Sequence, residues 1–315
     1  MSGNFLERIV AHKRRELARR RVTTPEAALE RLAADAPAPR LSGVAALFPP
    51  DHLGVMAEVK RASPSKGAIA LGLNAVDVAR RYAAGDADAI SVLTDEEFYR
   101  GSLDDLRAIR AAVPTPVMRK DFILNRYGLL EARAAGADLV LLIVAVLGRA
   151  DLPRLMRETA ELGMTPLVEA YTQAEAELAL EAGAALIGVN NRDLRTFDVS
   201  LETTERLAPL LAPHATVVSL SGIFDAGDAR RVVAAGARAV LVGEALVRAD
   251  DPAALIREVR AMALTPQPPL PHAGEGGSRD EADPFRLRGE GEEEGSLHVG
   301  RLPSPVRGRG VGGEG

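Results

Sequence analysis

Residues 139–190 read LVLLIVAVLGRADLPRLMRETAELGMTPLVEAYTQAEAELALEAGAALIGVN, and this stretch decides the fold. It contains short apolar runs that each predict a buried parallel strand: Leu139–Val144, Pro166–Glu169 and Leu186–Asn190. Between these runs the apolar residues recur at helical spacing, as from Leu152 to Thr159. The stretch therefore predicts strands that alternate with helices.

The same unit recurs on both sides of this stretch. Five further apolar runs predict strands: Val55–Lys60, Ala89–Leu93, Pro116–Lys120, Thr216–Leu220 and Ala239–Val242. Several predicted helices end in a glycine, which we expect to cap the last turn in the αL conformation: Gly85, Gly136, Gly163, Gly183 and Gly236.

Eight strand–helix units are typical of an α/β protein with a closed (β/α)8 TIM barrel. A doubly wound open sheet has the same alternation, but it normally carries a glycine-rich dinucleotide fingerprint after an early strand, and this sequence has none. We therefore predict a single barrel over residues 49–264, with an N-terminal helical extension over residues 1–48.

Residues 265–315 differ in composition from the rest of the chain. They hold 12 of the 29 glycines and 7 of the 20 prolines, with almost no periodic apolar pattern. Such a segment cannot bury enough surface to offset the entropy of ordering. We predict a low-complexity, disordered tail.

Composition excludes several classes of function. The chain has no cysteine, which rules out disulfides, thiolate metal sites and a cysteine nucleophile. Its net charge is −5 without blocks of basic residues, so no nucleic-acid partner is expected. It has neither a long apolar run nor a secretory signal pattern, which argues against a membrane partner. We expect a cytoplasmic protein that is a monomer or a weak homodimer.

Polar side chains gather where the predicted strands end, which is where barrels carry their active sites. Because side chains alternate along a strand, Glu58 and Lys60 of the first strand should point into the barrel mouth. Lys120, Glu169 and Asn190 should do so from three other strands. A buried layer of ion pairs is the alternative, at a cost of several kcal/mol per ion. Convergence from four strands favours a functional site.

Glycines follow the last two strands directly, in Ser221-Gly222 and Gly243-Glu244. Glycine lets backbone N–H groups approach an anion, and the loops after strands seven and eight of a barrel frequently bind phosphate. The sequence therefore predicts a phosphorylated small molecule as substrate.

Several strand-end motifs resemble those of the indole-3-glycerol-phosphate synthase family. They are EVKRASPS at 58–65, SVLTDE at 91–96, RKDFI at 119–123, LVE at 167–169 and IGVNNRDL at 187–194. The similarity runs in order from the N-terminal helix to about residue 263. The resemblance implies a (β/α)8 barrel with extra N-terminal helices. It also implies a carboxy-lyase of tryptophan biosynthesis, which closes the ring of 1-(2-carboxyphenylamino)-1-deoxyribulose 5-phosphate with loss of CO2 and water and uses no metal or organic cofactor.

The resemblance also implies catalytic roles. Lys120 matches the general acid that protonates the ribulose carbonyl, and Glu169 matches the carboxylate that transfers protons at the ring nitrogen and hydroxyl. Lys60 is similar to a second cation near the substrate's carboxylate and phosphate. Glu58 is expected to orient the lysines.

Substrate-binding roles follow from the same matching. Asn190 and Arg192 are expected to contact polar groups of the substrate. Ser63 is similar to the residue that faces the anthranilate carboxylate, and Phe122 to the aromatic wall beside its ring. The phosphate is expected at four residues: Ser221, Gly222, Gly243 and Glu244.

The chain departs from the family at Leu220. The family normally reads E-S-G where this chain has Leu220-Ser221-Gly222. Leucine accepts no hydrogen bond, and losing a positioned polar contact can cost about 10²–10³ in rate. Two alternatives stay open: a barrel that binds without efficient turnover, and another phosphosugar barrel such as phosphoribosylanthranilate isomerase. The combination of Lys60, Lys120 and Glu169 argues against that isomerase.

Overall fold

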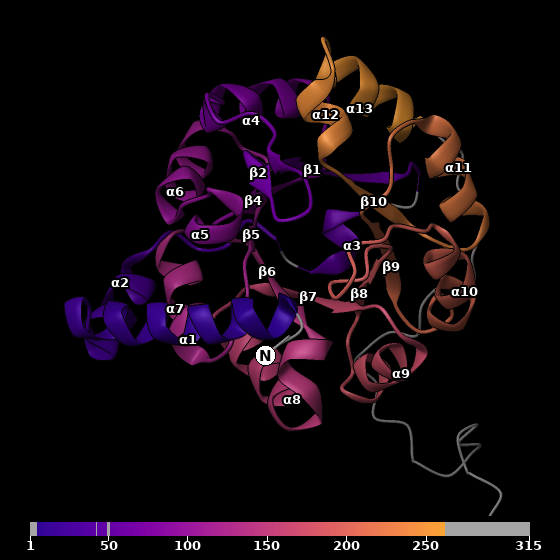
Figure 1. Ribbon diagram of the computed structural model, residues 1–315. Coiled ribbons are helices and arrows are strands. Elements are labelled where there is room, and N and C mark those ends of the chain that lie inside the picture. The colour runs from indigo at the N-terminus through magenta and orange to yellow at the C-terminus, as the bar shows by residue number, and fades with distance from the viewer. Residues whose placement is uncertain (1–4, 42, 49–50, 262–315) are drawn as a thin grey trace, which may run out of the picture. The chain divides into compact units, whose positions relative to one another are not determined.

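The computed structural model describes residues 5–41, 43–48 and 51–261. Within them, eight parallel strands close into a barrel in the order β1-β10-β9-β8-β7-β6-β5-β4 (Figure 1). The strands are β1 Gly54–Val59, β4 Ala89–Leu93, β5 Val117–Lys120, β6 Leu139–Ile143, β7 Thr165–Ala170, β8 Leu186–Asn190, β9 Thr216–Leu220 and β10 Ala239–Val242. The predicted barrel is confirmed, each strand end lies within one residue of its prediction, and the open sheet is excluded.

Helices surround the barrel and also precede it. They are α1 Phe5–Thr23, α2 Glu26–Asp35, α3 Val44–Leu47, α4 Ala75–Ala84, α5 Glu96–Tyr99, α6 Leu103–Ala112, α7 Arg126–Ala134, α8 Val144–Glu161, α9 Gln173–Glu181, α10 Glu202–Leu211, α11 Ala226–Ala234, α12 Glu244–Arg248 and α13 Pro252–Arg260. The predicted tail, residues 265–315, lies outside the described residues. No described helix is long and apolar enough to cross a membrane.

The predicted glycine caps occur at four of the five positions. Gly136, Gly163, Gly183 and Gly236 have positive φ, as the αL cap requires. The prediction for Gly85 is wrong, because its φ is −90°. A Cβ atom there would lie 2.7 Å from the Cα of Ala253, so close packing against α13 explains this glycine.

Each strand has two buried faces, which is why continuous apolar runs predicted them so closely. Val55, Ala57 and Val59 of β1 belong to the core shared with the outer helices. Met56 belongs to the core inside the barrel, as do Met118 and Leu167. Glu58, Lys120 and Glu169 each come two residues later on their strands, which directs them inward at the carboxyl ends.

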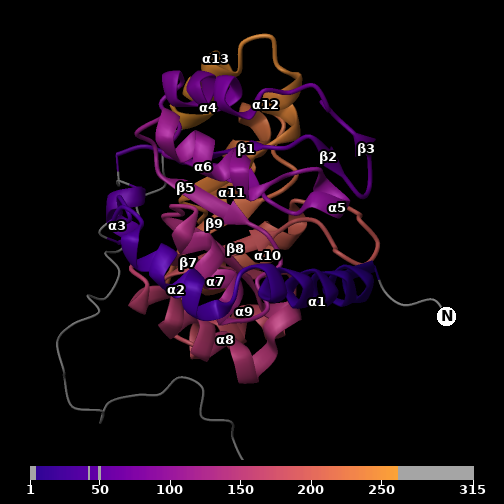
Figure 2. The ribbon, with the colours of Figure 1, turned by 90° about the vertical axis from the view of Figure 1, so that its left-hand side faces the viewer.

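The two ends of the barrel are closed differently. At the amino ends of the strands, the ring of Phe48 packs so tightly on Gly54 that a Cβ there would lie 2.2 Å from it. At the other end, Figure 2 shows α1, α5 and a hairpin gathered around the mouth. The hairpin is formed by β2 Ala62–Ser63 and β3 Gly67–Ala68. The predicted polar residues therefore lie at the end of the barrel that α1, α5 and the hairpin surround.

Candidate active site

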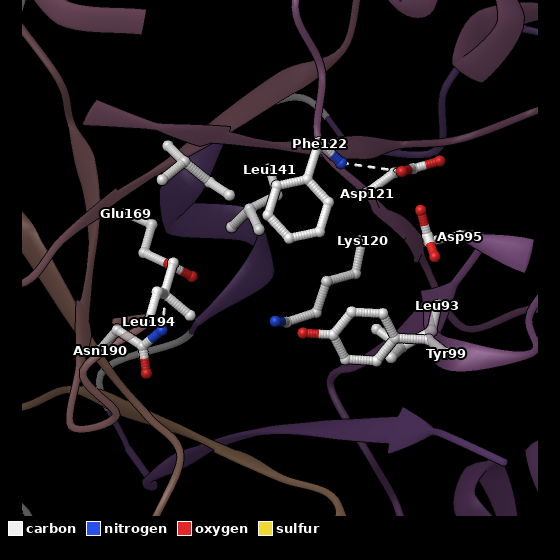
Figure 3. Close-up of a pocket in the computed structure, with 11 residues that line it drawn as sticks. Leu93, Asp95, Tyr99, Lys120, Asp121, Phe122, Leu141, Glu169, Asn190 and Leu194 are labelled. Atoms are coloured by element: carbon white, nitrogen blue, oxygen red, sulfur yellow. Dashed lines mark hydrogen bonds between the residues drawn. The ribbon is translucent and has the colours of Figure 1, made fainter. Parts of the chain in front are cut away.

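A hollow that opens to solvent lies at the carboxyl ends of the strands (Figure 3). It is lined by Leu93, Asp95, Tyr99, Lys120, Asp121, Phe122, Leu141, Ile143, Glu169, Asn190 and Leu194. The structure thus brings together four of the predicted site residues: Lys120, Phe122, Glu169 and Asn190. Apolar walls with a few convergent polar groups are typical of a small-molecule site.

Glu58 is shared between the two predicted lysines. Its Oε1 atom lies 2.7 Å from Lys60 Nζ, and its Oε2 atom lies 3.8 Å from Lys120 Nζ. Burial of Glu58 opposes its ionisation, but the charges of Lys60 and Lys120 outweigh this and hold the pKa of the carboxyl below its usual value. Glu58 is therefore an anion that fixes both cations at the mouth.

The pKa of Glu169 is shifted in the opposite direction from that of Glu58. Burial raises the pKa of its carboxyl, and the charge of Lys120 and a hydrogen bond from Asn190 only partly oppose the rise. Asn190 Nδ2 donates to Glu169 Oε1 at 3.0 Å, while Oε2 is buried with no hydrogen-bond partner in the part of the chain described here. A carboxyl with a raised pKa and a free oxygen beside an ammonium group can exchange protons with a ligand.

Glycine is required for different reasons in the two loops predicted to bind phosphate, by its conformation at Gly222 and by close packing at Gly243. Ser221 and Gly222 both have positive φ, at 64° and 82°. The carbonyl oxygen of Ser221 accepts a hydrogen bond from Asn191 Nδ2 at 2.9 Å. At Gly243 a Cβ atom would lie 2.7 Å from Glu58 Oε1 and 3.2 Å from Lys60 Nζ. The backbone of this second loop therefore passes directly beside the Lys60–Glu58 pair.

The side chain of Glu244 is already paired. Its Oε1 atom lies 2.8 Å from Lys66 Nζ and 3.0 Å from Arg248 Nε. Burial works against the charge, but these two cations lower the pKa of the carboxyl. An anion at this loop would meet the Glu244 backbone rather than its carboxylate.

Ser63 and Arg192 lie outside the hollow that Lys120 lines. Ser63 sits on the β2–β3 hairpin, where its Oγ atom accepts a hydrogen bond from Lys66 N at 3.3 Å. Arg192 Nη1 lies 3.3 Å from Ser65 Oγ and donates to the carbonyl of Phe197 at 3.0 Å. The hairpin after β1 is thus tied to the loop after β8.

Leu220, where the sequence analysis expects a departure from the E-S-G pattern, is a core residue. Leu220 is 1% exposed and belongs to the core inside the barrel. Its Cδ1 atom lies 2.6 Å from the position that a Cβ on Gly188 would occupy, so it fills the space above that glycine. This side of the mouth is therefore apolar.

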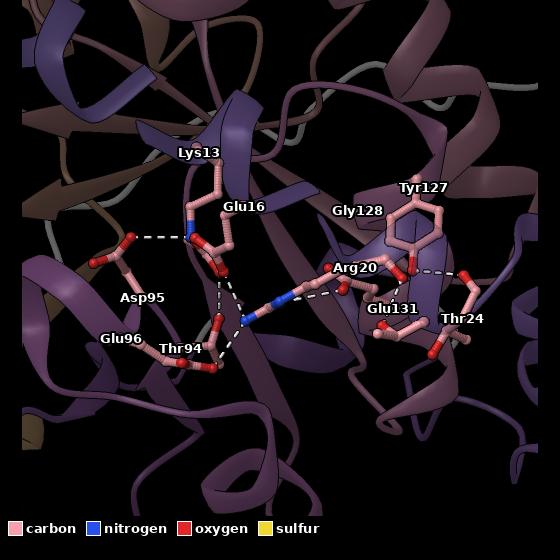
Figure 4. A network of polar contacts seen from close by, with 12 residues as sticks. Lys13, Glu16, Arg20, Thr24, Thr94, Asp95, Glu96, Tyr127, Gly128 and Glu131 are labelled. Carbon is pink, nitrogen blue, oxygen red and sulfur yellow. Dashed lines mark hydrogen bonds and ion pairs between the residues drawn. The ribbon is translucent and has the colours of Figure 1, made fainter. Parts of the chain in front are cut away.

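A buried ion network that the sequence analysis missed lies beside the hollow (Figure 4). Lys13 of α1 is 1% exposed, and its Nζ atom lies 2.9 Å from both Asp95 and Asp121 and 2.8 Å from Glu16. Burial opposes the charge, but Asp121, Asp95 and Glu16 raise the pKa of Lys13 well above its usual value. One signal was present: Lys13 falls on the same helical face as Ile9 and Leu17, which are buried.

Tyr99 is a second lining residue that the sequence analysis missed. Its ring lies 6.5 Å from that of Phe122, at an interplanar angle of 38°. It follows the motif at 91–96 by three residues, so the signal was proximity to a strand end. Within the described ranges, no group of three His, Cys, Asp or Glu residues has the geometry to hold a metal ion.

Comparison with known families and proteins gives a consistent result. A family model described as "Indole-3-glycerol phosphate synthase" matches residues 6–259. A protein of that name from a Nocardioides species is 51% identical over 261 residues, covering 81% of this chain and 98% of the relative. The one from Mycobacterium avium is 46% identical, covering 85% of this chain and 98% of the relative.

Solved structures with low sequence identity share the fold. A thiamine phosphate pyrophosphorylase from Pyrococcus furiosus has a TM-score of 0.51 at 20% identity, covering 66% of this chain and 93% of that structure. A 3-hexulose-6-phosphate synthase has a TM-score of 0.52 at 18% identity, covering 66% and 99%. At these identities the likeness supports the barrel alone.

Proposed function

The chain belongs to the indole-3-glycerol phosphate synthase family and is a carboxy-lyase of tryptophan biosynthesis, and we propose that Lys120 and Glu169 carry out the proton transfers of its ring closure. The substrate class is a phosphorylated small molecule, here 1-(2-carboxyphenylamino)-1-deoxyribulose 5-phosphate. With the family shown, a binding-only barrel and phosphoribosylanthranilate isomerase are not favoured.

The observation that carries the proposal is the placement of an ammonium group and a carboxyl with a raised pKa in one hollow. In the first step, the ring carbon that bears the carboxylate attacks the ribulose carbonyl carbon. Lys120 gives its proton to the carbonyl oxygen, which becomes a hydroxyl. The carboxylate then leaves as CO2, and its bonding electrons restore the aromatic ring.

Dehydration completes the reaction. The new hydroxyl leaves as water, for which it needs a proton, and the five-membered ring loses a proton as its double bond forms. Glu169 has a buried carboxyl with one oxygen free and Asn190 on the other, so it suits both transfers.

The remaining predicted residues are proposed to bind the substrate. The backbone N–H groups of the Ser221–Gly222 and Gly243–Glu244 loops hold the phosphate, and Lys60 lies beside the second loop. Phe122 forms one wall for the aromatic ring. Ser63 on the β2–β3 hairpin contacts the substrate carboxylate, and Arg192, whose side chain lies 3.3 Å from Ser65 Oγ on the same hairpin, contacts its polar groups.

A fluorescence assay tests the proposal. The purified chain is expected to convert the substrate into indole-3-glycerol phosphate, and Glu169→Gln is expected to lower kcat by about 10²–10⁴. The matched control is Glu161→Gln, at a carboxylate that is 68% exposed on α8. The proposal fails if the wild-type chain binds phosphate ligands but forms no product, or if the two variants turn over equally fast.

A further inference from the structure

The Tyr99 hydroxyl differs in its hydrogen bonding from the hydroxyls of the buried tyrosines. Tyr127 donates to the carbonyl of Thr24 at 2.9 Å, and Tyr82 donates to the carbonyl of Glu58 at 3.4 Å. Tyr99 is half-buried and lines the hollow, yet its hydroxyl bonds to none of the residues that the structure describes. The hydroxyl is not among the buried polar atoms that lack a partner, so it reaches the open space of the hollow and is available for a ligand.

The hydroxyl of Tyr99 is directed toward the centre of the proposed chemistry. Figure 3 shows it pointing toward the amine of Lys120, and both groups line the same hollow as Glu169. The ring beneath the hydroxyl packs near Phe122, at a centroid distance of 6.5 Å. The aromatic part therefore belongs to the wall of the hollow, and only its polar end faces the proton donor.

The turn that carries Tyr99 is held in place on both sides. Asp95 accepts a hydrogen bond from Phe98 N at 2.7 Å, and its other carboxylate oxygen lies 2.9 Å from Lys13 Nζ. On the far side of α5, a Cβ atom at Gly101 would lie 1.9 Å from the carbonyl oxygen of Leu93, so the turn packs directly on β4. A hydrogen-bond donor fixed in this way does not have to reorganise during the reaction.

We propose that the Tyr99 hydroxyl is a further catalytic group, which donates a hydrogen bond to the substrate oxygen that Lys120 protonates. This inference rests on the proposed function. As the ring carbon attacks the carbonyl, negative charge develops on that oxygen, and a second donor stabilises it until the proton of Lys120 arrives. The phenol keeps its own proton throughout, so the atom balance of the reaction is unchanged.

The electrostatics of the site agree with a donor role. Burial, together with the charges of Glu58, Glu169 and Asp95, raises the pKa of the Tyr99 phenol well above its usual value. The group therefore stays protonated over the pH range in which the enzyme is assayed. It can donate a hydrogen bond but cannot serve as a base.

Tyr99→Phe tests the inference, because it keeps the ring and removes only the hydroxyl. A contact made in the transition state predicts a loss of about tenfold in kcat with KM changed less than about twofold. The ratio of wild-type to variant kcat should stay constant from about pH 6 to pH 9, since the phenol does not titrate there. The matched control is Tyr127→Phe, whose hydroxyl serves the backbone at Thr24 and which should keep its kcat.

The outcomes separate this inference from the proposed function. Equal kcat in wild type and Tyr99→Phe, a rise in KM alone, or a kcat ratio that grows with pH would each overturn the donor role. Absence of turnover in the wild-type chain would overturn the proposed function instead.

Discussion

Leu220 is the residue at which the sequence analysis expects this chain to depart from the family pattern. Its side chain lies in the inner core above Gly188, and it pairs in register with Asn190 on one side and Leu241 on the other. An apolar side chain suits this position for packing, so the substitution favours stability at the edge of a site that handles charged groups. A carboxylate would be costlier to bury there.

Leu220→Glu is therefore expected to change rate and stability in opposite directions. We expect kcat/KM to rise about tenfold, because the substrate regains a positioned acceptor. The free energy of unfolding should fall by about 2 kcal/mol, because a polar group replaces core packing. Steady-state kinetics and urea unfolding measure the two effects.

Leu241→Glu is the control, since it puts the same group at the neighbouring inward position of β10. It should lose stability without a gain in rate. An unchanged kcat/KM in folded Leu220→Glu would show that the missing carboxylate is irrelevant to turnover.

Glu169 and Asn190 make a prediction about pH. Glu169 is proposed to act as a carboxylate, so kcat should fall at low pH as Glu169 becomes protonated. Because burial raises the pKa of Glu169, this acid limb of the kcat–pH profile should lie above the pH range usual for a glutamate. The hydrogen bond from Asn190 lowers the pKa of Glu169. Asn190→Ala removes that bond and should move the acid limb of the kcat profile to still higher pH. An acid limb that stays in place or moves to lower pH would show that the protonation of Glu169 does not control kcat.

The alternation of side chains along a strand was enough to predict the positions of some residues of the proposed site and not of others. Glu58, Lys120 and Glu169 lie on regular strands, where a period of two fixes which side chains face inward. Tyr99 lies on α5, a turn of four residues between β4 and α6, where no periodicity applies. Lys13 could be placed on the buried face of α1, but its partners are about 80 and 110 residues away and came only from the structure.

Among the elements, α1 contributes most to the site from outside the barrel. Lys13 forms an ion pair with Asp95, which caps α5 and so positions Tyr99. Lys13 also holds Asp121, whose carboxylate accepts a hydrogen bond from Phe122 N at 2.8 Å. One buried cation thus connects the two turns that carry the aromatic walls.

Lys13→Met should be strongly destabilising, because it leaves buried carboxylates without their cation. Removing one partner of a buried pair costs about 3–5 kcal/mol. Arg21→Met is the control on the same helix, where a side chain that is 45% exposed lies 3.6 Å from Glu26. We expect a loss of about 1 kcal/mol there. Urea midpoints compare the two, and equal losses would contradict a special role for Lys13.

The same network predicts how stability varies with pH. Folding raises the pKa of Lys13, so its contribution is full below the unfolded value of about 10.4 and is lost as pH rises through the folded value. Folding lowers the pKa of Asp121, mainly through Lys13 and Arg119 against the effect of burial. Its contribution is present above about pH 3.9 and is lost as pH falls through the folded value. The cost of Lys13→Met should therefore be largest between these limits.

At the scale of the whole molecule, the barrel separates stability from chemistry. The core inside the strands and the core beneath the helices are apolar, while the polar residues of the proposed site lie at one end. The strands could be predicted closely because burial on both faces demands unbroken apolar runs. The closure of the mouth could not, because it depends on ion pairs between distant loops, such as that of Lys66 with Glu244.

The central claim is that this mouth performs ring closure with Lys120 as its acid. The most direct measurement is the single-turnover rate of Lys120→Met at saturating substrate, compared with wild type. Glu58 keeps Lys60 as a partner at 2.7 Å when Lys120 is replaced, so the methionine variant should stay folded. We expect a rate at least about 10³-fold lower, since neither the proton nor the charge is supplied. A folded Lys120→Met variant that forms indole-3-glycerol phosphate within tenfold of the wild-type rate would contradict it.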